Sequence, residues 1–120
     1  MSSRFASMTY AVLAWLLAAL AVLHMASTWR LHSATPFTRV WFFGSGIAMA
    51  QAAALNFLHR RYGQSAPGLA WTTRAFNVVM LVFAGVAGVV TGASIGELVV
   101  ILGVLAALLV LSWTPTAQRN

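Results

Sequence analysis

Four long apolar stretches follow one another along the 120-residue chain, separated by short polar segments. They cover about residues 7–28, 37–59, 72–91 and 95–113. A helix that crosses a bilayer needs about 20 mainly apolar residues, because the hydrocarbon core is about 30 Å thick and each residue adds about 1.5 Å. The pattern therefore predicts an all-α fold, a single domain over residues 1–120 that forms an integral membrane bundle of four transmembrane helices.

Composition agrees with this prediction. The chain is 61% hydrophobic and only 7% charged, with a mean hydropathy of +0.86, whereas a soluble domain has about 25% charged residues. Such a chain has too few charges to cover a surface exposed to water.

The first stretch has a second interpretation. Arg4 followed by the apolar run 10–23 and then small residues also resembles a secretory signal peptide. Against this, the apolar stretch continues through Met25 and Ala26. We therefore expect a first transmembrane helix.

The basic residues indicate an orientation. All seven are arginines and only one acid opposes them, which gives a net charge of +6. With both termini in the cytoplasm, Arg30 and Arg39 lie outside and the other five lie inside, as the positive-inside rule favours. The arginines flank apolar runs, a placement typical of contact with membrane lipids and not with nucleic acid. Small size and the lack of a separate targeting segment favour a bacterial inner (plasma) membrane.

Aromatic residues and caps mark the expected helix ends. Trp29, Phe37 and Trp41 are predicted at the outer interface. The inner interface is predicted to hold Tyr10, Tyr62, Trp71 and Trp113. Thr35 before Pro36 suits a helix start, Pro67-Gly68 suits the inner loop, and Ser94 with Glu97 has the spacing of a capping box.

Small residues recur at helical spacing and predict close helix packing. Gly44 and Ala48 share a stripe in the second segment, and Gly88, Gly92 and Gly96 form two overlapping GxxxG matches. Four short helices enclose little interior, so some of these faces are expected to join copies of the chain in a homo-oligomer or to join a larger membrane complex.

Polar residues within apolar segments are the default candidates for function. His24 and Glu97 are expected at similar depth near the outer face, where with Arg39 they would form a proton-handling or ligand-binding site. The alternative is structural, with His24 hydrogen-bonded near a helix end and Glu97 capping the fourth helix. Gln51, near the midplane, needs a partner in the bundle, in an oligomer or in a ligand.

Two asparagines are expected near the inner face. Asn56 precedes Arg60 by one turn and Asn77 follows Arg74 by three residues, which places both amides at similar depth. We expect a hydrogen bond between the second and third helices.

Other chemistry has little support. No group of carboxylates or histidines has metal-ligand spacing, so no metal site is predicted. His24 and His59 are expected at opposite faces, which excludes a bis-histidine haem within one subunit. No cofactor is predicted, although a single haem or pigment bound through His24 stays open. No serine has an evident catalytic partner.

The leading hypothesis is therefore a non-enzymatic subunit or scaffold of a membrane assembly, which packs through its Gly and Ala faces. The alternatives are a small transporter or lipophilic-ligand binder that uses Gln51, His24 and Glu97, and a haem or pigment carrier that uses His24.

Overall fold

The computed structural model describes residues 2–118, which are helical apart from short connections and contain no strand. Each of the four α-helices is long and apolar enough to cross a membrane, which confirms the predicted helix number. The helices, with two short 3-10 turns named η1 and η2, run in the order α1 (Ser3–Ser27), η1 (Thr28–Arg30), α2 (Pro36–Tyr62), α3 (Pro67–Thr91), α4 (Ile95–Ser112) and η2 (Pro115–Ala117).

Two of the predicted helix starts agree with the structure, and the predicted start of the third helix does not. Thr35 caps α2 through a bond from the Thr38 N–H, and Ser94 with Glu97 forms the predicted capping box of α4. The loop predicted at Pro67 is wrong, because Pro67 begins α3. Proline lacks the N–H that a first helical turn leaves unpaired, so it fits there without loss.

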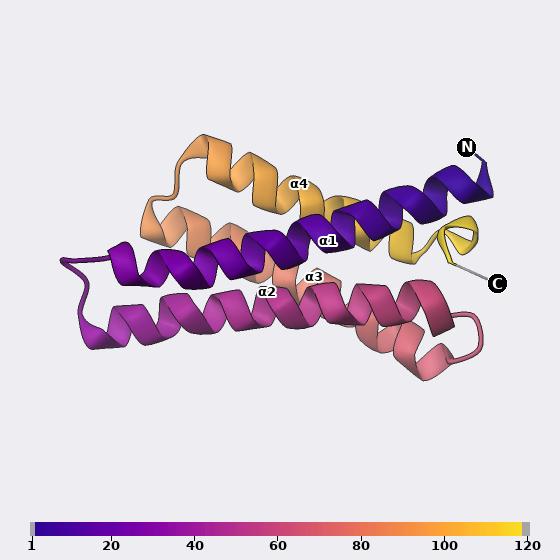
Figure 1. Ribbon diagram of the computed structural model, residues 1–120, viewed down its shortest axis with the longest axis horizontal. Helices are drawn as coiled ribbons and strands as arrows, with labels where there is room; N and C mark the ends of the chain where they lie inside the picture. The colour runs from indigo at the N-terminus through magenta and orange to yellow at the C-terminus, as the bar shows by residue number, and fades with distance from the viewer. Residues whose placement is uncertain (1, 119–120) are drawn as a thin grey trace.

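The four helices run up and down in sequence order (Figure 1). One end of the bundle holds the start of α1, the α2–α3 connection and η2; we name it the Tyr10 end. The other holds η1, the loop before α2 and the α3–α4 turn; we name it the His24 end. The longest extent of the molecule is 48 Å.

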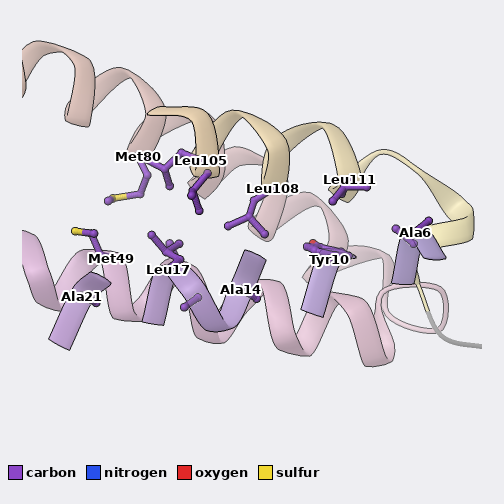
Figure 2. Packing of buried hydrophobic residues seen from close by; sticks show 14 residues of the cluster. Ala6, Tyr10, Ala14, Leu17, Ala21, Met49, Met80, Leu105, Leu108 and Leu111 are labelled. Carbon is purple, nitrogen blue, oxygen red and sulfur yellow. The ribbon is translucent and has the colours of Figure 1, made fainter. Parts of the chain in front are cut away.

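The core is built around one stripe of α1. Its buried residues recur every three or four positions and lie on one helix face. They are Ala6, Tyr10, Ala14, Leu17 and Ala21. Leucines of α4 point toward this stripe (Figure 2). Met49 and Met80 lie at the end of the stripe opposite Ala6. Alanines allow the helices to approach closely, and the larger side chains fill the remaining space.

The packing face of α2 differs from the predicted one. Gly44 is exposed, and a Cβ added there would have no heavy atom within 4 Å. Gly46 is buried instead, and a Cβ on it would lie 3.3 Å from the backbone of both Ala21 and Met25 on α1. Ala48 lies at the edge of the contact and is half-buried. The helix is therefore rotated so that Gly46, and not Gly44, meets α1.

The predicted GxxxG face is also corrected. Only Gly88 packs closely, because a Cβ there would collide with the side chain of Leu98 on α4. Gly92 lies beyond the end of α3 with φ of 69°, a left-handed conformation that favours glycine. Gly96 belongs to the first turn of α4 and has open space around it. The three glycines therefore form no continuous face, since a turn separates them.

Candidate functional site

His24 is held in a defined position near the His24 end. Its ring stacks on Phe42 of α2, with ring centroids 3.8 Å apart. Its Nε2 lies 2.8 Å from Ser45 Oγ, and Ser45 donates its own hydroxyl hydrogen to the Phe42 carbonyl. Because a hydroxyl has one hydrogen, the tautomer that fits the Ser45–Phe42 bond is the one in which His24 Nε2–H donates to Ser45 Oγ. Nδ1 then carries a lone pair, and no hydrogen bond to it occurs within residues 2–118.

Glu97 is exposed at the start of α4. Its Oε2 accepts hydrogen bonds from the Ser94 N–H and the Ser94 hydroxyl, at 2.9 and 3.0 Å. These bonds give the carboxylate the capping role expected of it. Oε1 makes no hydrogen bond within the described part of the chain, so half of the carboxylate is available to another group.

A cleft of about 360 Å³ brings His24 and Glu97 together. It opens between α1, α2 and α4, near the start of α4. The two side chains line one cleft without forming an ion pair. The lining residues are Leu20, Leu23, His24 and Ser27 of α1, Phe42 and Met49 of α2, and Gly96, Glu97, Val100 and Ile101 of α4.

Arg39 does not belong to this cleft. Its Nε and Nη2 donate to the Leu31 carbonyl at 3.2 and 2.9 Å, and Nη2 also lies 3.4 Å from the His32 carbonyl oxygen. The guanidinium thus fixes the loop between η1 and α2. The structure therefore does not bring Arg39 to the cleft that His24 and Glu97 line, because these carbonyls hold the arginine on the loop.

Gln51 does not belong to the cleft either. It is exposed on the outward side of α2, and its amide makes no hydrogen bond within residues 2–118. The structure therefore does not bring Gln51 to the cleft that His24 and Glu97 line, because Gln51 lies on the exposed face of α2, whereas Phe42 and Met49 of the same helix face the cleft.

A buried polar cluster lies toward the Tyr10 end. Asn56 Nδ2 donates to Asn77 Oδ1 at 2.8 Å, and Asn77 Nδ2 donates to Asn56 Oδ1 at 3.0 Å. Asn56 uses its second amide hydrogen on the Ala52 carbonyl. Both asparagines are fully buried. The pair therefore joins α2 to α3 through two reciprocal side-chain hydrogen bonds.

Tyr10 and His59 extend this cluster. Tyr10 donates to Asn56 Oδ1 at 2.8 Å, and its oxygen lies 2.9 Å from His59 Nδ1. Both side chains are fully buried, and His59 Nε2 has no hydrogen-bond partner. Tyr10, predicted as an aromatic residue of the inner interface, has its ring in the core and presents no surface to lipid. The sequence offers one sign of this contact. Tyr10 precedes Ala14 by four residues and Leu17 by seven, so it lies on the same face of α1 as these two core residues.

Arg74 makes a second contact at the Tyr10 end that the sequence did not predict. Arg74 Nε donates to the Ser112 carbonyl at 3.0 Å, and the guanidinium lies 4.3 Å from the centroid of Trp113. Trp71 packs edge-on against Trp113. This arrangement anchors the end of α4 to α3.

The described residues contain no group of three or more His, Cys, Asp or Glu side chains able to hold a metal ion. No family model matches this chain, and no characterised protein or solved structure is similar enough to match it.

Proposed function

We propose that this chain is an integral membrane protein whose four helices all cross the bilayer. The support is its surface, where large apolar side chains are exposed along every helix, because soluble monomers rarely expose large contiguous apolar patches. A length of 48 Å suits a bilayer of about 40–45 Å including headgroups.

The proposed orientation places both termini in the cytoplasm, in a bacterial inner membrane. The Tyr10 end carries Arg4, Arg60, Arg61 and Arg74, whereas the His24 end carries Arg30 and Arg39. Arg119 lies outside the described residues. The positive-inside rule then places the Tyr10 end inside.

We further propose that the protein is a non-enzymatic subunit that assembles with a second copy of itself through α2. The outward face of α2 has exposed residues separated by alternating steps of four and three. They are Val40, Gly44, Ile47, Gln51, Ala54 and Leu58, and we name them the α2 seam. A repeat averaging 3.5 residues is the spacing at which two helices pack side by side.

Gln51 is the observation that carries this proposal. An unpaired amide in hydrocarbon is unfavourable, and hydrogen bonds between helices relieve it. A glutamine both donates and accepts. Across a twofold axis along the membrane normal, the second copy brings its own Gln51 to the same depth. Gly44, with open space around it, allows the two helices to approach.

The chain contains no cysteine, which allows a direct crosslinking test. The single-cysteine variant I47C, oxidised in the native membrane, should give a disulfide-linked dimer. V82C is the matched control, since Val82 is an exposed apolar residue on α3. Addition of Q51L to I47C should shift the dimer equilibrium roughly fivefold toward the monomer, for a loss of about 1 kcal/mol.

Equal crosslinking of I47C and V82C would show random collision and contradict the α2 seam. A protein that stays monomeric in mild detergent and in membranes would contradict self-assembly altogether.

A further inference from the structure

The cleft between α1, α2 and α4 has an unusual polarity. Its polar side chains are His24, Ser27 and Glu97, and all other lining residues are apolar or glycine. A volume of about 360 Å³ lies in the range of small-ligand sites, which span about 300–1,000 Å³.

Each of the three polar side chains presents acceptors to a ligand. In the tautomer that donates Nε2–H to Ser45 Oγ, His24 keeps a lone pair on Nδ1. Ser27 donates its hydroxyl hydrogen to the Leu23 carbonyl at 2.7 Å, so only its lone pairs remain. Glu97 is ionised and accepts only, with Oε1 unused.

Among residues 2–118, no arginine lines the cleft to oppose a positive ligand. Arg39 precedes the cleft residue Phe42 by three positions in the sequence, but its guanidinium donates to the loop carbonyls of Leu31 and His32. The single carboxylate of the sequence is at the cleft, although the net charge of the chain is +6. The local electrostatics therefore favour a cation at this place.

From this arrangement we propose that the cleft binds an amphiphilic primary ammonium ion. The ammonium group donates to His24 Nδ1, Ser27 Oγ and Glu97 Oε1. Its alkyl chain lies along the apolar wall formed by residues such as Leu20, Met49 and Ile101. An ammonium has three N–H donors, which matches three acceptors. A quaternary ammonium has the same charge without donors, and an anion is repelled.

This proposal does not depend on assembly through the α2 seam. Phe42 and Met49 are the α2 residues of the cleft, and neither belongs to the seam. The variant Q51L, monomeric or not, should bind the ligand as the wild type does.

The test measures binding of radiolabelled decylammonium to the full-length protein in phosphatidylcholine nanodiscs, after subtraction of empty nanodiscs. Saturable binding is expected. Decyltrimethylammonium should compete about tenfold more weakly, because it cannot donate hydrogen bonds to the acceptors. Decanoate should not compete.

Three variants locate the site. E97Q removes the charge but keeps the capping box, which glutamine also forms, and should weaken binding about tenfold. S33K is the matched control, because adding one positive charge raises the net charge from +6 to +7, as E97Q does. Ser33 is exposed on a loop outside the cleft, so S33K should bind the ligand as the wild type does. G96L fills the cleft where a Cβ meets nothing within 4 Å, and should abolish binding.

Equal affinity of E97Q and the wild type would overturn the proposal, and so would a preference for the quaternary ion or the absence of saturable binding. If G96L does not fold, the comparison of E97Q with S33K decides alone. Nanodiscs with phosphatidylethanolamine then distinguish two sources of the ammonium. A lipid headgroup as ligand would suppress decylammonium binding there, whereas a free amine as ligand would leave it unchanged.

Discussion

Asn56 of α2 and Asn77 of α3 exchange two hydrogen bonds in the buried interior, at 2.8 and 3.0 Å. Each amide thus satisfies the other, and Asn56 also accepts from Tyr10. Buried polar groups are costly when left unpaired, so this pair favours one relative placement of α2 and α3 over others.

Loss of one amide should destabilise the bundle. N77A leaves Asn56 with an unpaired donor and a weakened acceptor, for an expected loss of about 1–2 kcal/mol in the free energy of unfolding. SDS-induced unfolding from mixed micelles, followed by circular dichroism, measures it. A double-mutant cycle with N56A should give a coupling energy near 1 kcal/mol. Strictly additive single effects would argue against a direct bond.

Removal of the Tyr10 hydroxyl should destabilise the bundle, because this hydroxyl has two buried partners, Asn56 and His59. Y10F removes the partner of His59 Nδ1 and one donor to Asn56, with an expected loss of about 1–2 kcal/mol of unfolding free energy. Y62F is the matched control, because Tyr62 is exposed and its contact with Arg61 is through the ring. Thermal unfolding in detergent compares them. Equal effects would mean that Tyr10 is not buried in this cluster.

Gly46 and Gly44 should respond differently to alanine. G46A places a methyl group against Met25 and the backbone of Ala21, for an expected loss of about 1–3 kcal/mol. G44A meets no atom within 4 Å and should change the unfolding free energy of the monomer by less than about 0.5 kcal/mol. The measurement is SDS unfolding of monomeric protein. A larger loss for G44A would indicate that α2 is rotated the other way.

The turn after α3 provides a test of backbone conformation. G92A should cost about 1–2 kcal/mol because alanine disfavours φ of 69°, whereas G96A should be close to neutral. G92N should lose less than G92A, since asparagine tolerates the left-handed region better. Thermal unfolding of the three variants checks this order. Equal losses for G92A and G96A would favour a continuous glycine packing face instead.

The sequence by itself determined the helices and much of their termination. Apolar length fixed their number, because a run of about 20 residues has few alternatives to a spanning helix. Local spacing gave the caps at Thr35 and Ser94, since capping involves only neighbouring residues. The similar depths of Asn56 and Asn77, and of His24 and Glu97, follow from counting residues along helices of known rise.

Only the tertiary structure decided how each helix is rotated. Gly44 and Gly46 lie two residues apart, on nearly opposite sides of α2, and an alanine follows each of them four residues later, Ala48 and Ala50. In a soluble bundle the polar side would identify the outer face, but here the exposed face is also apolar, so the pattern contains no such signal. Rotation placed Gln51 outside, Tyr10 in the core, and His24 beside the cleft with Glu97. Those placements required the packing of all four helices.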